Sequence, residues 1–326
     1  MNITLTGTTG FVGSALLPAL SQHHQTRAIT RAEFGDLLPT TDYTAALTHA
    51  DVVIHLAARV HIMHDTAADP LEEFRRTNTA GTLNLARQAA TAGVRRFIYL
   101  SSIKVNGEHT QPGQPFTAPM ASTPMASTTL SQRTRALSVV EGQTSQDPYA
   151  QSKQEAEQAL RQLALETGME VVIIRPPLVY GPGVKANFLS MMRWLHKGIP
   201  LPLGSIHNHR SLVALPNLID LITTCIDHPA AANQTFLVSD GEDLSTTALL
   251  RRLGHALGKP ARLLPIPQAW LETTLTLLGK RAIAQRLCGS LQIDLSHTRN
   301  TLGWSPPVSV DAALRQTAEA YLQAQR

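Results

Sequence analysis

The fold of this chain is decided near its start, by the stretch Ile3-Thr4-Leu5-Thr6-Gly7-Thr8-Thr9-Gly10-Phe11-Val12-Gly13. Its apolar beginning is typical of a short strand, and the residues after it have a helical pattern. A glycine-rich turn between a strand and a helix is the context that a dinucleotide-binding fingerprint requires. We expect Gly7 to permit the tight turn, Gly10 to let a pyrophosphate approach the backbone, and Gly13 to let the helix pack closely. The G-x-x-G-x-x-G spacing departs from G-x-G-x-x-G, and an ordinary strand-to-helix turn would also use glycine.

The end of the second expected strand, residues 26–31, indicates a preference between the two nicotinamide cofactors. An NAD site usually has an acidic residue there, about 20 residues after the glycines, to bind the ribose 2′-hydroxyl. This chain has Thr30-Arg31 instead, and a guanidinium group binds a 2′-phosphate that a carboxylate would repel. We therefore expect NADP(H), bound through Arg31. NAD(H) is the alternative, with Glu33 as the acid and Arg31 as a solvated loop residue.

Strand-like and helix-like runs continue to alternate along the chain. Residues 77–93 have a helical pattern that Gly93 closes, and strand-like runs occur at residues 51–58, 96–102, 170–175 and 235–239. Apolar strands suit a parallel sheet that is covered on both faces. We therefore predict an α/β fold, with a doubly wound, Rossmann-type parallel sheet and a smaller, mostly helical C-terminal substrate domain.

The expected domains are an NAD(P)-binding domain at residues 1–180 and a substrate-binding domain at 181–326, with 211–240 returning to the Rossmann sheet. Residues 117–146 form an insertion that is rich in Ser, Thr and Pro and repeats Pro-Met-Ala-Ser-Thr in tandem. A loop of this length is unusual inside a compact domain. We interpret it as a surface insertion, and a lid over the cleft between the domains is the alternative.

The composition excludes several classes of protein. The 326 residues carry a net charge of +4, are 43% hydrophobic and contain no Lys/Arg block, so neither a disordered chain nor a nucleic-acid partner is expected. Cys225 and Cys288 fit neither a disulfide framework nor a metal-ligand spacing, which indicates a reducing compartment and no metal site.

The N-terminus lacks a secretory signal and no run of about 18 apolar residues occurs, so we expect a cytoplasmic protein without a membrane span. The run from Trp270 to Leu278 is short and contains Glu272, and we interpret it as a buried helix of the substrate domain.

The run Tyr149-Ala150-Gln151-Ser152-Lys153 opens a helix after a proline and carries the candidate catalytic residues. Its i, i+4 spacing puts Tyr149 and Lys153 on one face of that helix. We expect the Lys153 ammonium group to favour the phenolate and so to lower the pKa of Tyr149. Ser102 ends the preceding expected strand, where ligands meet a parallel sheet. A tyrosine in this place can exchange a proton with a hydroxyl or carbonyl group.

These motifs together resemble one family closely. The chain is similar to the extended short-chain dehydrogenase/reductases, in the NAD-dependent epimerase/dehydratase branch that acts on nucleotide sugars. The resemblance covers nearly the whole chain except the insertion. The motifs that carry it are the glycine turn, the run His55-Leu56-Ala57-Ala58, Asn78, Ser102, Tyr149, Lys153 and the runs at 175–182 and 302–306.

The resemblance implies a role for each matching residue. Tyr149 is the catalytic acid/base, Ser102 binds the sugar oxygen at the reacting carbon, and Lys153 holds the nicotinamide ribose. Arg210 and Asn187 match positions that bind the nucleotide diphosphate; a surface ion pair and a local turn are their alternatives. Lys104, beside Ser102, either contacts the substrate or only shapes the loop. The implied cofactor-binding residues are Gly7, Gly10, Phe11, Val12, Gly13, Arg31, Leu56, Ala57, Ala58, Asn78, Tyr149, Lys153 and Pro176.

Three reactions share this scaffold. A 4,6-dehydratase normally carries an Asp-Glu pair directly after the catalytic serine, where this chain has Ile103-Lys104, so dehydration is not expected. The runs at 100–107, 176–188 and 203–208 resemble a bacterial subgroup that reduces UDP-4-keto-6-deoxy-N-acetylglucosamine to UDP-N-acetylquinovosamine, an O-antigen precursor. We therefore expect a UDP-sugar 4-ketoreductase. The alternatives are a 4-epimerase of UDP-glucose or UDP-N-acetylglucosamine, which keeps NAD bound, and a non-catalytic NADP(H) sensor. The family also implies a homodimer, formed through the helix that carries Tyr149 and its neighbour.

Overall fold

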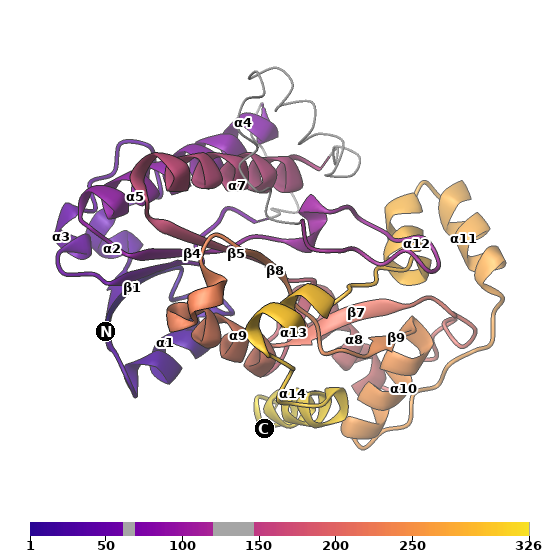
Figure 1. The fold of residues 1–326 in the computed structure, drawn as a ribbon. Coiled ribbons are helices and arrows are strands. Elements are labelled where there is room, and N and C mark those ends of the chain that lie inside the picture. Colours follow the sequence, from indigo (N-terminus) through magenta and orange to yellow (C-terminus); the bar gives the residue numbers. More distant parts are fainter. Residues whose placement is uncertain (61–68, 120–146, 326) are drawn as a thin grey trace.

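Figure 1 shows the fold in the computed structural model, which describes residues 1–60, 69–119 and 147–325. Helices cover both faces of a central sheet, and a second group of helices and short strands lies beside it. Most of the insertion at 117–146 lies outside the described residues, so its interpretation stays a prediction.

Six parallel strands form the central sheet, in the order β2-β1-β3-β4-β5-β8. Next to the edge strand β2, Thr4 of β1 lies between Arg27 of β2 and Val53 of β3. The prediction of a Rossmann-type α/β fold is confirmed. The strands are β1 (Asn2–Thr6), β2 (Gln25–Ile29), β3 (Val52–His55), β4 (Arg96–Leu100), β5 (Glu170–Arg175) and β8 (Thr235–Leu237).

The two faces of this sheet are buried by different helices because successive side chains of a strand point to opposite sides. Val52 and Ile54 of β3 belong to one hydrophobic cluster, together with residues of α1 and α9. Val53 belongs to a second cluster, together with residues of α5 and α7. Both faces are therefore covered, as the apolar strands predicted. The helices are α1 (Gly13–Ser21), α9 (Leu215–Asp227), α5 (Thr82–Thr91) and α7 (Pro148–Thr167).

The helix predicted at residues 77–93 begins earlier and is less regular than expected. It starts with α4, where the Asp69 carboxylate accepts a hydrogen bond from the Glu72 backbone N–H at 3.1 Å and Pro70 follows directly. Both residues are helix-start signals. A π-helical segment then leads into α5, and such segments occur frequently at functional sites. The bounds are α4 (Pro70–Phe74) and, for the π-helix, η1 (Arg75–Gly81).

A second, smaller sheet has the strand order β6-β7-β9, in which β6 and β7 are parallel and β9 is antiparallel. Within the segment 211–240 that we expected to return to the Rossmann sheet, β7 belongs to this small sheet, whereas α9 and β8 accompany the large one. The strands are β6 (Leu178–Tyr180), β7 (Arg210–Ala214) and β9 (Asp243–Leu244). Short elements also occur at α2 (Arg31–Phe34), α3 (Thr44–Leu47), η2 (Ile103–Val105) and η3 (Pro229–Ala231).

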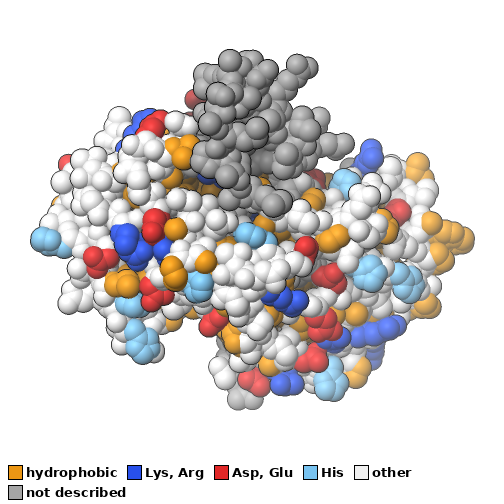
Figure 2. All heavy atoms as spheres, in the orientation of Figure 1, with side chains coloured by type: hydrophobic (Ala, Val, Ile, Leu, Met, Phe, Trp, Pro, Cys, Tyr) orange, Lys and Arg blue, Asp and Glu red, His pale blue; other side chains and the backbone are white. Residues whose placement is uncertain are grey.

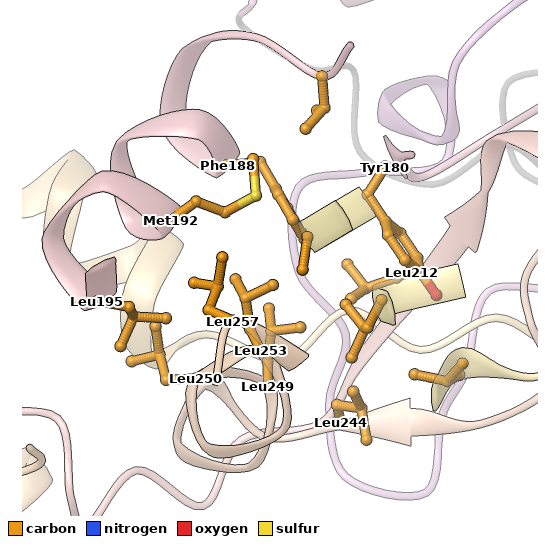
Figure 3. Close-up of a cluster of buried hydrophobic side chains, with 14 of the residues drawn as sticks. Tyr180, Phe188, Met192, Leu195, Leu212, Leu244, Leu249, Leu250, Leu253 and Leu257 are labelled. Carbon is orange, nitrogen blue, oxygen red and sulfur yellow. The ribbon is translucent and has the colours of Figure 1, made fainter. Parts of the chain in front are cut away.

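The small sheet has a hydrophobic core of its own (Figure 3). Phe188 and Met192 point from α8 toward Leu249 and Leu253 of α10, and Tyr180 stacks on Phe188 with ring centroids 5.5 Å apart. Sequence reasoning gave no helix at α8, because its segment contains scattered glycine and proline. The helices of this part are α8 (Ala186–His196), α10 (Thr246–Ala256), α11 (Gln268–Leu277), α12 (Arg281–Cys288) and α14 (Val310–Gln323), whereas α13 (Ser296–Leu302) packs against β8 of the large sheet.

Helix α11 contradicts one expectation. The run from Trp270 to Leu278 was predicted to form a buried helix, but α11 has no buried residue and Trp270 is 72% exposed. The prediction was wrong because an apolar run was equated with burial. Within the part of the chain that the structure describes, no helix has both the length and the apolar character needed to cross a bilayer.

Candidate active site

The carboxyl ends of the parallel strands meet at one edge of the central sheet, and most of the predicted site residues follow these ends. Along the strand order, Arg31 follows β2, the glycine turn follows β1, and residues 56–58 follow β3. Ser102 then follows β4 and Pro176 follows β5. In open α/β sheets this edge is where ligands bind.

The three glycines of the turn differ in what surrounds them. Gly7 has a φ of +71°, and a Cβ atom there would lie 2.7 Å from the backbone nitrogen of Ala57. A Cβ atom on Gly13 would lie 2.2 Å from the carbonyl oxygen of Gly7. Gly10 is exposed, and a Cβ atom there would approach only the Gly7 oxygen, at 3.1 Å. Close packing thus explains why positions 7 and 13 need glycine. Gly10 instead exposes its backbone to solvent, where a pyrophosphate would fit.

The start of α1 offers backbone donors to an anion. Val12 occupies the N-cap position, and its side chain cannot cap the first N–H groups of the helix. Phe11 and Val12 are half-buried and pack against the two hydrophobic clusters on either side of the turn. The positive end of the helix dipole therefore lies beside exposed Gly10, which fits a diphosphate.

Both residues that bear on NADP versus NAD form ion pairs on the surface. Arg31 lies 3.2 Å from Asp36 with its side chain 83% exposed, and Glu33 lies 3.3 Å from Arg27. Exposed pairs of this kind contribute only about 0–1 kcal/mol. A cofactor phosphate or ribose can therefore compete for either residue.

Tyr149 and Lys153 lie on the first turns of α7. The Asp147 carboxylate caps this helix by accepting a hydrogen bond from the Tyr149 backbone N–H at 3.1 Å. The buried Lys153 ammonium group donates a hydrogen bond to the carbonyl oxygen of Leu100, at the end of β4, at 2.8 Å. It also lies 4.4 Å from the ring centroid of Tyr99. Lys153 thus joins α7 to β4.

Ser102 and Lys104 lie in the turn that follows β4, against the start of α7. The Ser102 hydroxyl oxygen accepts a hydrogen bond from the Lys104 backbone N–H at 3.3 Å, which starts η2. The Lys104 ammonium group forms an ion pair with Asp147 and lies 6.0 Å from the ring centroid of Tyr149. The backbone N–H of Ile103, which lies between Ser102 and Lys104, donates to the Pro176 carbonyl oxygen at 3.0 Å. The turn carrying Ser102 is therefore fixed to both α7 and β5.

The pKa of Tyr149 shifts in the direction opposite to the one expected. Burial and the neighbouring Asp147 carboxylate raise the pKa of Tyr149 to about 12. Burial lowers the pKa of Lys153 to about 7. The expectation considered only the attraction between the ammonium group and the phenolate, whereas desolvation disfavours both charged forms. Tyr149 is therefore protonated at neutral pH.

Asn78, predicted to join the polar network of the cofactor, is buried and makes its described contacts within the protein. Its side-chain oxygen accepts from the Arg59 backbone N–H at 2.8 Å, and its amide nitrogen donates to the Arg59 carbonyl oxygen at 3.0 Å. The amide nitrogen also donates to the Ser152 hydroxyl at 3.1 Å. Asn78 thus ties the loop after β3 to the catalytic helix, from its place in the π-helix η1.

Sequence reasoning missed a buried ion pair next to Tyr149 and Lys153 on α7. Glu157 lies one turn after Lys153, and both Glu157 and Arg175 of β5 are almost fully buried. The Arg175 Nε atom donates to the Glu157 carboxylate at 2.9 Å, and the Arg161 guanidinium donates to it at 2.9 Å. Burial opposes the charge of Glu157, but the two guanidinium groups outweigh it and lower its pKa. The signal was present in the i, i+4, i+8 spacing of Tyr149, Lys153 and Glu157.

His55 was quoted as part of a motif but was given no role. Its Nδ1 atom lies 2.6 Å from the Thr6 hydroxyl and its Nε2 atom lies 2.9 Å from the Thr82 hydroxyl. Thr6 in turn accepts a hydrogen bond from the Ala57 backbone N–H at 3.2 Å. Burial and the charge of Lys153 lower the pKa of His55 to about 3, so its ring is neutral. His55 fixes the backbone that the predicted cofactor residues Leu56, Ala57 and Ala58 share.

The predicted diphosphate residues lie in the part of the molecule built on the small sheet. Asn187 is exposed in the first turn of α8. Arg210 begins β7, and its Nη1 atom donates to the carbonyl oxygens of Arg286 and Gly289 at 3.3 and 3.1 Å. Burial lowers the pKa of Arg210, and within the described residues no carboxylate pairs with it. Its guanidinium is thus held by the end of α12 without being neutralised, as a phosphate ligand requires.

Comparisons with known proteins agree with this arrangement. A model of the NAD dependent epimerase/dehydratase family matches residues 3–239. A UDP-glucose 4-epimerase from Vibrio cholerae is 49% identical over 336 aligned residues, which cover 99% of this chain and 96% of the relative.

Solved structures share the fold over their whole length. The UDP-glucose 4-epimerase of Thermotoga maritima, determined with UDP-glucose, aligns with a TM-score of 0.72 and 19% identity and covers 100% of both chains. The protein RMD of Pseudomonas aeruginosa, determined with NADPH, aligns with a TM-score of 0.70 and 20% identity and covers 98% of this chain and 99% of its own. With the family model covering most of the chain, the family resemblance seen in the motifs is confirmed: the chain belongs to the NAD dependent epimerase/dehydratase family.

Proposed function

We propose that this chain is a UDP-sugar 4-epimerase, which interconverts UDP-glucose or UDP-N-acetylglucosamine with its C4 epimer. The observation that carries the proposal is the 49% identity to a UDP-glucose 4-epimerase over almost the full length of both chains. This relative supports epimerisation better than the 4-ketoreductase that the sequence favoured. The cluster of Tyr149, Lys153 and Ser102 at the end of β4 supports either reaction.

Tyr149 is the proton carrier of the proposed reaction. A nicotinamide cofactor, held by the start of α1 and by Lys153, would supply the hydride acceptor and donor for C4 of the sugar, so that the hydride could return to the opposite face. Tyr149 exchanges the proton of the C4 hydroxyl group, and its pKa of about 12 means that it needs a positive charge beside it to become a phenolate. Lys153, one helical turn away, supplies that charge when protonated, and Ser102 orients the C4 oxygen.

The proposed binding residues divide between the two sheets. The exposed Gly10 and the start of α1 receive the cofactor diphosphate, and Lys153 receives the nicotinamide ribose. Arg210 and Asn187 bind the diphosphate of the UDP-sugar, because Arg210 is an unneutralised guanidinium held by backbone carbonyls. Lys104 keeps the turn of Ser102 in place through its ion pair with Asp147.

The cofactor of an epimerase must be regenerated on the enzyme, so the proposal predicts tightly held NAD(H). The sequence favoured NADP(H), because Arg31 replaces the usual acid after β2. Reduction of UDP-4-keto-6-deoxy-N-acetylglucosamine with NADPH is therefore the rival function, and Arg31 is the observation that favours it. A sensor of NADP(H) without turnover is the third possibility.

One pair of assays separates these functions. The purified protein is incubated with UDP-glucose or UDP-N-acetylglucosamine, and sugar nucleotides are resolved by chromatography. In parallel, UDP-4-keto-6-deoxy-N-acetylglucosamine is added with NADPH or NADH, and the nicotinamide absorbance is followed. The proposal expects C4 epimers without net change in absorbance. Consumption of NADPH or NADH without any epimer would establish the reductase instead, and cofactor binding without either reaction would establish the sensor.

A further inference from the structure

Helices α11 and α12 pack against each other as a hairpin that presents apolar side chains to solvent. Trp270 is 72% exposed, Leu277 83%, Leu278 64% and Ile283 43%. Figure 2 shows hydrophobic side chains gathered at the end of the molecule where Figure 1 places α11. Trp270 and Leu277 are seven residues apart, so they lie on the same side of α11. A patch of this kind on a soluble surface marks an interaction site.

The surroundings of this patch are strongly basic. Residues 251–289 contain seven Lys or Arg residues and a single acidic residue, a net charge of +6, whereas the whole chain carries only +4. Lys280 and Arg281 follow Leu278 directly in the turn between α11 and α12 and are exposed. Neither of them forms an ion pair within the described residues. The rest of the chain is therefore slightly acidic, and its positive charge is concentrated around the exposed apolar hairpin.

We propose that the α11–α12 hairpin docks this protein on the surface of an anionic lipid bilayer. Tryptophan prefers the membrane interface, because its ring is apolar and its N–H group is polar. Exposed leucines insert among the acyl chains, and unpaired Lys and Arg side chains bind anionic headgroups. α11 has 10 residues, too few to span a bilayer, so the hairpin lies along the surface.

Docking would orient the part of the molecule that holds the proposed substrate. The carbonyl oxygens of Arg286 and Gly289, at the end of α12, hold the Arg210 guanidinium. The hairpin on the bilayer and the proposed diphosphate contact are therefore joined by direct hydrogen bonds. The inference concerns location and does not depend on which reaction the active site performs.

Cosedimentation with vesicles tests this inference on the full chain. We expect the protein to pellet with vesicles of phosphatidylcholine and phosphatidylglycerol at low salt, much less with pure phosphatidylcholine, and less as salt rises. The double variant Trp270→Ser/Leu277→Ser should lower the partition coefficient about tenfold or more, since it removes apolar area that docking buries. Lys280→Gln/Arg281→Gln should weaken binding to anionic vesicles only.

A matched control and a spectroscopic readout make the test specific. Trp194→Ser removes a tryptophan that is 47% exposed on α8, outside the hairpin, and it should bind vesicles as the unaltered protein does. Vesicles should shift tryptophan fluorescence to the blue in Trp194→Phe but not in Trp270→Phe. Absence of vesicle binding would overturn the inference. Loss of self-association in Trp270→Ser/Leu277→Ser would also overturn it, because the hairpin would then be an interface with a second copy of the chain. Epimerase or reductase turnover in solution should be equal in all these variants, so failure of docking is distinct from failure of the proposed function.

Discussion

The groups around Tyr149 disfavour loss of its phenolic proton, so the side chain is protonated in the resting protein. Burial and Asp147 raise its pKa to about 12. Substitution Tyr149→Phe removes the hydroxyl group that exchanges the proton in the proposed reaction, and we expect kcat to fall about a thousandfold, within the range of general acid–base catalysis. The assay is turnover of UDP-glucose or UDP-N-acetylglucosamine by quantitative chromatography. Cofactor affinity, measured by fluorescence titration, should stay the same; an equal loss of cofactor affinity would mean that Tyr149 acts in binding.

His55 links the stability of the protein to pH. Its pKa is about 3 in the folded protein, against 6.5 for an unperturbed histidine. Between these values the unfolded chain binds a proton that the folded protein does not, so the free energy of unfolding falls as pH falls from 6.5 toward 3. At pH 5 this costs about 2 kcal/mol. Urea unfolding at pH 7 and pH 5 should show a larger loss in the unaltered protein than in His55→Gln; equal losses would refute the assignment.

At the scale of single residues, spacing predicted neighbours better than it predicted environments. The i, i+4 rule put Tyr149 and Lys153 on one face, and both lie there at the start of α7. Their pKa values could not be read from spacing, because desolvation depends on everything that packs around them. For the same reason, the contacts of Asn78 could not be predicted from the sequence. Its neighbours Arg59 and Ser152 lie 19 and 74 residues away in the chain, and only the fold brings them together.

At the scale of elements, the buried pair Glu157–Arg175 joins α7, the helix that carries Tyr149 and Lys153, to β5. Removing one partner of a buried ion pair leaves an uncompensated charge, and we expect Glu157→Gln to lower the free energy of unfolding by about 3–5 kcal/mol. The double variant Glu157→Gln/Arg175→Met removes the buried charge as well and should recover part of this loss. Urea unfolding measures both. A single variant that loses less than about 1 kcal/mol would show that Arg161 alone or water compensates the pair.

Element prediction succeeded where local signals agreed with packing. Apolar strands bounded by glycine or proline were located within a few residues, because each is buried on both faces. The helices of the small sheet were harder to predict. α8 buries Phe188, Met192 and Leu195, but the glycine and proline before it obscured the helical pattern. α11 is apolar yet has no buried residue, so it breaks the rule that a helix buries its apolar side.

At the scale of the whole molecule, Asp240 is a junction between the two sheets. It follows β8 of the large sheet, and its carboxylate accepts hydrogen bonds from Tyr180 at 2.8 Å and from the Ala214 backbone N–H at 2.8 Å, at the ends of β6 and β7. The Asn217 side chain of α9 donates to it at 2.7 Å. A single buried carboxylate thus fixes how the parts that carry the proposed cofactor and substrate residues meet. No motif indicated this role, since its partners come from two segments, one around Tyr180 and one from Ala214 to Asn217, that are distant from it in the sequence.

Helices α5 and α7 lie side by side on one face of the sheet. We propose a homodimer in which this helix pair packs on its copy around a two-fold axis, the commonest symmetry of such assemblies. Light scattering at micromolar concentration should give twice the chain mass of 35.3 kDa. Gln158 and Gln162 are exposed on α7, and Gln158→Lys/Gln162→Lys would bring like charges together across the axis and shift the mass toward the monomer. The matched control Gln316→Lys/Gln323→Lys adds the same charge to α14 and should leave the mass unchanged; a monomeric unaltered protein would contradict the proposal.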